Sequence, residues 1–359
     1  METGPSDSDP VITLVEAMFG RKKSTRTASA CDWLWTGIGE TGWWSSWSVI
    51  CLAAGAGGIA VGVHTTQFAI RDPRHGLFRP VLELAAETIG AELQARPRPF
   101  ARIAGVVGRT GQALSEARLA ADLGYDAVLL SLAAWGDATD EAMLAHCRTV
   151  AEVRPLFGFY LQPAVGGRVL SYRFWRQFVE IPRVAAIKIA PFNRYQTLEV
   201  VRAVADAGRD DIALYTGNDD SIVVDLLSRF RAPHGVERRI VGGLLGQWAV
   251  WTRQAVEMLH RIRRLPDEAP LDPAWFRLAT ALTDANAALF DAAGGFRGCI
   301  PGIHEVLRRQ GLLAGTWCLE EDEGLSPGQR EEIDRVLTSH PELNDDRFVT
   351  EHLAEWLAT

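Results

Sequence analysis

A single lysine stands inside an apolar stretch of the sequence. Lys188 lies in VAAIKIAPFN (184–193), flanked by small and β-branched residues and followed by Pro191 and Asn193. This pattern predicts a buried strand that ends in a loop. Burial disfavours the charged ammonium form, and a free amine attacks ketones to form a Schiff base. The alternative is a structural lysine whose stem packs while its ammonium group reaches water.

Two other segments carry groups that could serve the same chemistry. Tyr160, in FYLQP (159–163), is predicted at the end of the preceding strand, where a phenol could move protons to and from an imine. The alternative is a tyrosine of the core. Thr65 and Thr66, in HTTQF (64–68), offer hydroxyl and backbone N–H groups at a loop, which suit a carboxylate.

The elements that must position these groups follow from short apolar runs. The runs that predict strands are IAVGV (59–63), RIAGVV (102–107), DAVLLSL (126–132), LFGFYL (156–161), VAAIKIA (184–190), IALYTG (212–217) and RIVGGL (239–244). The segments of helical period between them include 113–124, 139–153, 171–181 and 194–208. Alternating strands and helices indicate a parallel sheet covered by helices, and strands that are apolar throughout fit burial on both faces.

With one more strand possible upstream, these units predict a (β/α)₈ TIM barrel, in which catalytic groups lie at the carboxyl ends of strands. The alternative is an open doubly wound sheet, which requires G-x-G-x-x-G after its first strand. The related GVVGRTG (105–111) follows a middle strand instead.

The chain divides into three parts by composition. We expect a disordered tail at 1–25, the barrel at 26–265 and a C-terminal helical extension at 266–359. Ser326 and Pro327 predict the N-cap and first turn of one extension helix. The helices expected in the extension are 272–295, 301–313, 326–340 and 346–358.

The ordered motifs resemble those of the dihydrodipicolinate synthase / N-acetylneuraminate lyase superfamily of class I aldolases. That family carries G-T-T-G-E after its second strand, Y-x-x-P ending the fifth and G-[IV]-K ending the sixth; HTTQF, YLQP and AIK stand here in that order. The resemblance covers roughly residues 55–340. Its further matching segments are YTGND (215–219), IVGG (240–243) and 286–313.

The resemblance implies roles for six residues. Lys188 would form the Schiff base with pyruvate or a related 2-oxo acid, Tyr160 would transfer protons, and Thr65 would link Tyr160 to a relay. Retro-aldol cleavage, aldol addition and dehydration all pass through this imine and its enamine, so the lysine does not fix the reaction. No metal and no cofactor is implied. The residues expected to bind substrate are Thr66, which would hold the carboxylate, Gly217 and Val241.

Several departures from the family pattern argue against dihydrodipicolinate synthesis itself. Gln67 and Phe68 stand where the family has glycine and glutamate, and Trp135 stands near a tyrosine of the synthases. Arg168 is out of register with the synthases' arginine for a second carboxylate. Trp135 and Phe68 favour a more apolar or aromatic substrate.

Residues 31–50 hold five of the chain's 12 tryptophans where the family has its first strand and helix. An aromatic lid and an out-of-frame stretch of the coding DNA are the two interpretations. The uncharged run at 49–63 is shorter than the roughly 20 apolar residues of a membrane span. It better fits a helix and a strand joined by a glycine-rich turn.

Composition restricts the partners. A net charge of −8 argues against nucleic acid, because phosphate contacts require a basic face. Five cysteines without a C-x-x-C pair indicate reduced thiols in a cytoplasm. Neither nucleic acid nor membrane is therefore expected as a partner. The resemblance implies a small-molecule 2-oxo acid and an aldehyde as partners and, by analogy with the family, a homodimer or homotetramer.

Three functions are consistent with these features. The leading one is a Schiff-base-forming lyase, aldolase or hydro-lyase acting through Lys188. The second is a non-catalytic barrel that serves as a binding or regulatory module, which the departures favour. The third is a barrel enzyme of another class, such as a phosphate-binding isomerase, which would prefer a glycine-rich phosphate loop; VGGLLG (241–246) has no basic residue directly after it.

Overall fold

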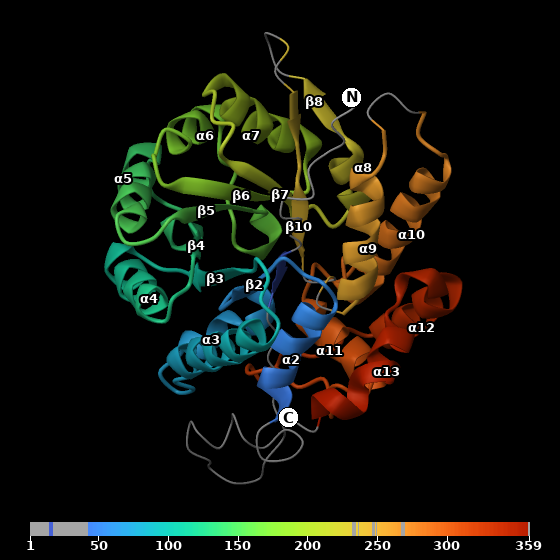
Figure 1. Ribbon diagram of the computed structural model, residues 1–359. Helices are drawn as coiled ribbons and strands as arrows, with labels where there is room; N and C mark the ends of the chain where they lie inside the picture. Colours follow the sequence, from blue (N-terminus) through green and yellow to red (C-terminus); the bar gives the residue numbers. More distant parts are fainter. Residues whose placement is uncertain are drawn as a thin grey trace.

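Eight parallel strands form a closed barrel at the centre of the molecule (Figure 1). The computed structural model describes residues 14–16, 42–231, 235, 237–245, 248, 250–266 and 270–357. Around the barrel the strands follow the order β1-β10-β7-β6-β5-β4-β3-β2. The predicted (β/α)₈ barrel is therefore confirmed, and the doubly wound sheet is wrong. The barrel strands are β1 (Leu14–Glu16), β2 (Gly58–Val61), β3 (Ala101–Val106), β4 (Ala127–Leu130), β5 (Leu156–Leu161), β6 (Val184–Ala190), β7 (Ala213–Thr216) and β10 (Gly242–Leu245).

Helices surround the barrel and connect successive strands. Polar side chains fix where several of them begin: the hydroxyl of Thr139 accepts from the N–H of Ala142, and that of Ser171 accepts from the N–H of Phe174. A short antiparallel hairpin, β8 (Arg229–Arg231) with β9 (Glu237–Arg239), precedes β10. The helices of the barrel layer are α2 (Gly42–Ala53), α3 (Phe78–Ala95), α4 (Thr110–Asp122), α5 (Asp140–Ala151), α6 (Tyr172–Phe178), α7 (Arg194–Asp206), α8 (Ile222–Leu227) and α9 (Thr252–Arg263).

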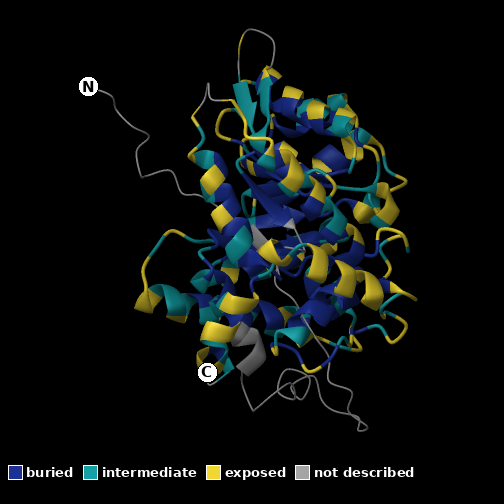
Figure 2. Ribbon diagram, turned by 90° about the vertical axis from the view of Figure 1, so that its right-hand side faces the viewer, coloured by how far each residue is buried: buried dark blue, intermediate teal, exposed yellow. Residues whose placement is uncertain are grey.

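The two faces of the strands build two separate cores. On β6, Ile187 and Ile189 point outward into the layer between sheet and helices, whereas Ala186 and Ala190 point into the barrel. This follows from the two-residue period of a strand, which sends alternate side chains to opposite faces. Figure 2 shows the buried strands inside a layer of helices whose outer faces are exposed. The apolar strand runs are thus explained by burial on both faces.

The strand that closes the barrel lies in the segment expected to be a disordered tail. β1 pairs with β2 through Leu14 and Gly58, and with β10 through Leu14 and Leu244. The expectation of disorder is therefore wrong for Leu14–Glu16, because backbone pairing on both sides orders even a three-residue strand. The rest of 1–25 lies outside the described residues.

Part of the tryptophan-rich segment is a barrel helix. Helix α2 begins at Gly42 and packs against α3, and its Trp47 is 3% exposed in the outer core. The lid interpretation is therefore wrong for 42–50, and the first strand lies before the segment rather than inside it. Residues 31–41 lie outside the described part, and the frame-shift interpretation stays a hypothesis about the coding DNA.

The C-terminal extension is helical, as the sequence predicts. Its α10 packs against α8 of the barrel layer and its α13 against α2, so the extension is docked on one side of the barrel (Figure 1). Within the described residues, no helix is long and apolar enough to cross a membrane. The extension helices are α10 (Ala274–Leu289), α11 (Cys299–Arg309), α12 (Gln329–Ser339) and α13 (Asp346–Leu357).

Candidate active site

Lys188 points into the barrel from β6. Its side chain follows the same phase as Ala186 and Ala190, which belong to the inner core, and the residue is only 6% exposed. Its Cα lies opposite Phe159 of β5 and Tyr215 of β7 in the sheet register. The structure therefore has Lys188 buried inside the barrel, as the sequence predicts.

The neighbours of Lys188 leave space for its side chain and provide an aromatic face for its nitrogen. The Nζ atom lies 4.7 Å from the centroid of the Phe159 ring, within the range of a cation–π contact. At Gly217, just beyond β7, an added Cβ would lie 3.0 Å from Cε of Lys188 and 2.6 Å from Cβ of Ala190. Only glycine at 217 gives the lysine chain this path.

The amine faces a small cavity at the carboxyl ends of β5, β6 and β7. Its volume is ≈ 70 Å³. A single water occupies roughly 10–15 Å³ on this scale, so the cavity has room for a small molecule. Most of the lining is apolar or aromatic. The lining residues are His64, Phe159, Leu161, Gln162, Val165, Lys188, Ala190, Phe192, Gly217, Asp219, Phe290, Phe296 and Cys299.

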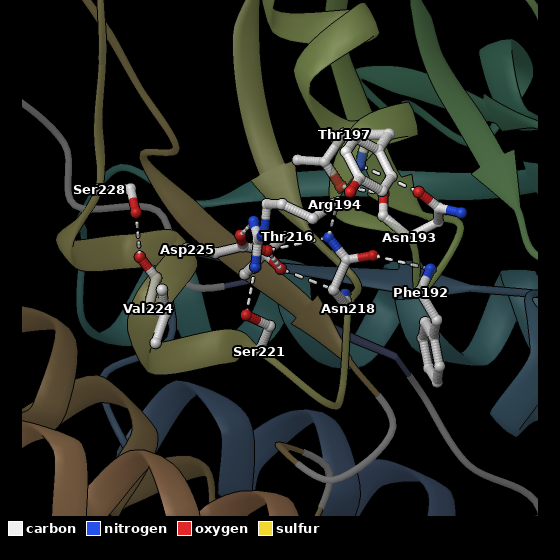
Figure 3. A network of polar contacts seen from close by, with 11 residues as sticks. Phe192, Asn193, Arg194, Thr197, Thr216, Asn218, Ser221, Val224, Asp225 and Ser228 are labelled. Atoms are coloured by element: carbon white, nitrogen blue, oxygen red, sulfur yellow. Dashed lines mark hydrogen bonds and ion pairs between the residues drawn. The ribbon is translucent and has the colours of Figure 1, made fainter.

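A buried polar network holds the loops beside this cavity (Figure 3). Asp225 of α8 is fully buried; its Oδ1 pairs with Arg194, and its Oδ2 accepts from the Thr216 hydroxyl at 2.5 Å. The same Oδ2 accepts from Nδ2 of Asn218 at 2.9 Å. A buried carboxylate is stable only when it is paired and hydrogen-bonded in this way. The network therefore anchors the β7–α8 loop, which supplies Gly217 and Asp219 to the lining.

The network also fixes an aromatic residue of the lining. Oδ1 of Asn218 accepts from the N–H of Phe192, which has a φ of 53°, and the Phe192 ring points away from the network (Figure 3). Phe296, between α10 and α11, has a φ of 67°. The two rings meet edge to face, with centroids 5.8 Å apart. Two bulky residues in the left-handed region thus face each other at the cavity.

The whole architecture is similar to solved enzymes of known fold. A dihydrodipicolinate synthase from Cyanidioschyzon merolae with lysine bound matches 92% of this chain and 98% of its own, with a TM-score of 0.69 and 19% identity. A monomeric dihydrodipicolinate synthase variant matches 93% and 99%, with a TM-score of 0.68 and 16% identity. The fold is that of the dihydrodipicolinate synthases.

Sequence identity adds to this likeness over one stretch. A 4-hydroxy-tetrahydrodipicolinate synthase of Cyanothece sp. (strain PCC 7425 / ATCC 29141) is 29% identical over 121 residues. That stretch spans 33% of this chain and only 40% of the relative's length. No protein-family model matches the chain. The resemblance to the dihydrodipicolinate synthase / N-acetylneuraminate lyase superfamily is thus confirmed at the level of the fold.

Within this synthase fold, Tyr160 does not point where the motif suggested. It is fully buried in the outer core, where its ring lies 5.2 Å from that of Trp175. Its hydroxyl donates to the carbonyl of Leu170 and accepts from the N–H of Leu170, both at 3.1 Å. Burial raises its pKa. The structure thus places Tyr160 outside the cavity lining, and its expected proton-transfer role stays a prediction; Phe159, one residue earlier, has the inward phase of Lys188.

The threonine pair lies in a short 3₁₀ turn after β2, η1 (His64–Thr66). Both threonines are buried, and the hydroxyl oxygen of Thr66 accepts from the N–H of Gly62 at 3.1 Å. The cavity lining includes His64 of this turn but neither Thr65 nor Thr66. Their expected roles in the relay and in carboxylate binding therefore stay predictions, with His64 as the residue of the turn that reaches the cavity.

The two remaining predicted substrate residues differ in their placement. Gly217 lines the cavity beside Lys188. Val241, just before β10, is not part of the lining: its N–H donates to the carbonyl of Leu214, and its carbonyl accepts from Arg263 of α9 at 2.8 Å. Both backbone groups of Val241 thus serve the sheet and its helix layer, while its side chain packs against the inner core; its expected contact with substrate stays a prediction.

Three residues that depart from the family pattern, Phe68, Trp135 and Arg168, are not part of the cavity lining. The guanidinium of Arg168 donates to the carbonyls of Trp135 and Ala138 at 3.1 and 2.8 Å, which ties two loops together. The Trp135 ring lies 4.6 Å from that of His146. Neither Arg168 nor Trp135 lines the cavity, and Phe68 does not either.

Sequence reasoning missed most of the cavity wall. Phe159 could have been found from the register that pairs it with Lys188, and Asp219 stands inside the YTGND motif. Phe290, Phe296 and Cys299 come from the C-terminal extension. No local pattern in the sequence indicates that the extension reaches the carboxyl ends of the barrel strands. Among the described residues, no group of three or more histidine, cysteine or acidic side chains is arranged to hold a metal.

Proposed function

We propose that this protein is a Schiff-base-forming lyase or aldolase that acts on pyruvate or a related 2-oxo acid through Lys188. The observation that carries the proposal is a buried amine facing a cavity at the carboxyl ends of the barrel strands. The synthase fold and the partial identity to a 4-hydroxy-tetrahydrodipicolinate synthase support it.

The distribution of lysine in the chain also supports a chemical role for Lys188. Of the 37 basic residues, only Lys22, Lys23 and Lys188 are lysines, and all others are arginines. Arginine stays protonated and does not form a Schiff base, so it cannot replace a nucleophilic amine. In the described part of the chain, Lys188 stands alone among arginines, and it is buried and faces the cavity.

The proposed reaction starts when neutral Nζ attacks C2 of the 2-oxo acid. Loss of water gives a protonated imine, and loss of a proton from C3 gives an enamine. In the aldol direction, C3 of the enamine attacks an aldehyde carbon, the aldehyde oxygen takes up a proton, and water then releases the product and the lysine. In the lyase direction the same bonds break in reverse order. The cationic imine nitrogen keeps the ring of Phe159 as a partner.

Proton transfer requires a group other than Tyr160 in this proposal. Besides Lys188, the ordinary acid–base side chains of the lining are His64 and Asp219. Asp219 is carried by the loop that the Asp225 network anchors, and its backbone carbonyl accepts from Nδ2 of Asn286 at 2.7 Å. We assign proton transfer to His64 and Asp219, with the substrate carboxylate directed toward the η1 turn.

A second candidate function is a non-catalytic barrel that binds a ligand or regulates a partner. The outward placement of Tyr160 favours it, since one expected proton-transfer group is absent from the cavity lining. A cytoplasmic location and a homodimer or homotetramer belong to the leading proposal as expectations. One of the structural neighbours described above is a monomeric variant, so the assembly requires its own measurement.

The test is trapping of the imine. The protein is incubated with pyruvate and borohydride, and intact mass is measured. We expect one adduct equal in mass to pyruvic acid less one oxygen atom, lost in Lys188→Arg, which keeps the positive charge, and in Lys188→Ala.

Lys22→Arg/Lys23→Arg is the matched control, because it removes the other two lysines and leaves the adduct in place. Absence of an adduct with every 2-oxo acid tried would sink the aldolase proposal and leave the binding module. An adduct that persists in Lys188→Arg would show that Lys188 is not the nucleophile.

A further inference from the structure

The cavity wall beyond Lys188 indicates what the second substrate looks like. Resting on the proposed Schiff-base function, we infer that the carbonyl partner of the Lys188-bound 2-oxo acid carries an uncharged aromatic or bulky apolar group. Phe192 and Phe296 are the residues that select it.

The first observation is the position of these two rings. Phe192 follows β6, the strand that carries Lys188, and Phe296 comes from the segment between α10 and α11. Both line the cavity, and their rings meet at an interplanar angle of 79°. Edge-to-face contact leaves one ring face and one ring edge for a third aromatic group, an arrangement that aromatic clusters favour.

The second observation is that both rings are held at a cost to the backbone. Bulky residues rarely adopt positive φ, and such conformations persist only where the surroundings fix them. The N–H of Phe192 donates to Oδ1 of Asn218 at 3.0 Å, and the N–H of Phe296 donates to the carbonyl of Asp291 at 2.8 Å. Glycine would suit both positions better for the backbone alone. The rings themselves therefore account for phenylalanine at 192 and 296.

The third observation is the charge of the lining. In the described part of the chain, the lining contains no arginine, and besides Lys188 only His64 can carry a positive charge. Asp219 contributes a carboxylate to the same wall. Arg168, which the sequence suggested for a second carboxylate, is bonded to backbone carbonyls elsewhere. An aldehyde with its own carboxylate would thus find no arginine in this lining, whereas an uncharged ring would meet the rings of Phe192 and Phe296.

The bond changes are those of the aldol step. C3 of the enamine on Lys188 forms a bond to the aldehyde carbon, the aldehyde oxygen is protonated, and hydrolysis of the imine by water frees a 4-hydroxy-2-oxo acid. The group on the aldehyde carbon takes no part in these steps. Its recognition is left to the wall that Phe192, Phe296 and Phe290 form.

The experiment offers three aldehydes in competition. The full-length protein is incubated with pyruvate and an equimolar mixture of benzaldehyde, succinic semialdehyde and acetaldehyde, then reduced with borohydride. Intact mass distinguishes pyruvate alone on Lys188 from pyruvate joined to each aldehyde. Lys188→Arg identifies adducts formed elsewhere, and omission of pyruvate identifies direct alkylation by an aldehyde.

We expect benzaldehyde to be joined to pyruvate about tenfold or more above succinic semialdehyde, the scale on which a pocket discriminates between groups. In Phe296→Ala, the benzaldehyde-to-acetaldehyde ratio, normalised to the pyruvate adduct of the same variant, should fall by about tenfold. Phe276→Ala is the matched control, because Phe276 on α10 is 59% exposed and does not line the cavity.

The outcomes separate the two proposals. Three outcomes overturn the inference while a pyruvate adduct still supports the Schiff base. These are pyruvate joined to no aldehyde, pyruvate joined to benzaldehyde without preference, and a benzaldehyde-to-acetaldehyde ratio that is the same in Phe296→Ala as in the wild type. No pyruvate adduct at all overturns the proposed function, and the inference with it.

Discussion

At the residue scale, the barrel interior places one amine among groups that fit it closely. The Nζ atom of Lys188 lies 4.7 Å from the centroid of the Phe159 ring, and Gly217 lies beside the lysine chain. All three residues line the cavity. A buried lysine is costly unless its surroundings accept the charged or the neutral form. The Phe159 face can accept the cation, and the cavity gives the nitrogen access to a carbonyl.

Removal of the Tyr160 hydroxyl tests whether this residue belongs to the site. In Tyr160→Phe, we expect adduct formation with pyruvate to stay within about threefold of the wild type, because the hydroxyl faces Leu170 in the outer core. The free energy of unfolding should fall by about 1–3 kcal/mol, since a buried N–H and a carbonyl lose their partner. Adduct kinetics and urea denaturation measure the two effects. Slow adduct formation at unchanged stability would contradict the outward placement.

Gly217→Ala tests the path of the lysine chain. The added Cβ would meet Cε of Lys188 at 3.0 Å and Cβ of Ala190 at 2.6 Å, so the amine must shift. We expect the rate of borohydride trapping to fall about a hundredfold, the effect of a displacement near 1 Å in a reacting group.

The matched control for Gly217→Ala is Gly90→Ala within α3, where no atom lies within 4 Å of the added Cβ. Alanine is the better helix former there, so stability should rise by roughly 0.5–1 kcal/mol and trapping should not change. Equal trapping rates in the two glycine variants would show that Lys188 does not depend on Gly217.

Which of these residues the sequence could predict depends on strand phase. Lys188 is recognisable because a charge inside an apolar run has few explanations. Tyr160 satisfies a motif by spacing, but spacing does not tell which face of the strand a residue occupies, and a change of one position reverses it. The inward residue is Phe159, which the register with Lys188 identifies only once the two strands are paired.

At the element scale, distant segments of the chain complete the ends of helices. The carboxylate of Asp345, just before α13, accepts from the N–H groups of Arg253 and Gln254 in the first turn of α9 at 2.7 and 2.9 Å. Burial nevertheless raises the pKa of this carboxyl to about 7, with the two N–H groups opposing the shift. A helix of the barrel layer thus depends on the extension for its cap.

This cap makes stability depend on pH. From about pH 4 to pH 7, the folded chain keeps a proton on Asp345 that the unfolded chain releases, so this group lowers stability as pH rises through the window. Asp345→Asn keeps an oxygen acceptor and removes the titration. We expect the urea midpoint of the wild type to fall more than that of the variant between about pH 5 and pH 8. Parallel pH profiles for the two proteins would show that Asp345 does not titrate in this range.

Apolar runs predicted the interior strands well because burial on both faces leaves a plain signal. β1 escaped notice because it has only three residues inside a polar segment, and its stability comes from two neighbours distant in sequence. The predicted N-cap of α12 was also wrong, because the helix is capped by Gly328 rather than by Ser326. The Ser326 hydroxyl instead donates to the carboxylate of Asp291 at 2.5 Å. Long-range contacts of this kind leave no trace in local spacing.

At the scale of the whole molecule, barrel and extension share one core. The outer core runs from Trp47 on α2 to Trp356 on α13, and α10 connects it to α8. Phe290, Phe296 and Cys299 of the extension complete the cavity wall. The sequence predicts an extension of helices, but which barrel helices it covers follows from surface shape that composition does not encode.

A shared core implies that both parts unfold together. Trp356→Ala removes a side chain of α13 that is 2% exposed in the outer core, and should lower the free energy of unfolding by about 3–5 kcal/mol. Hydrogen exchange should accelerate in α2 and α13 alike. Trp317→Ala is the control, since Trp317 is 36% exposed and a surface change costs about 0.5 kcal/mol or less. Faster exchange confined to α13 would indicate two independent units.

The pairing of β1 with β10 has a consequence for how the chain is made. β1 is synthesised long before β10, because the two paired strands lie at Leu14–Glu16 and Gly242–Leu245. Until β10 is made, the nascent sheet has open edges that could recruit strands from other chains. Ring closure therefore waits until β10 has been synthesised, and a chaperone that shields those edges until then would raise the yield of folded protein.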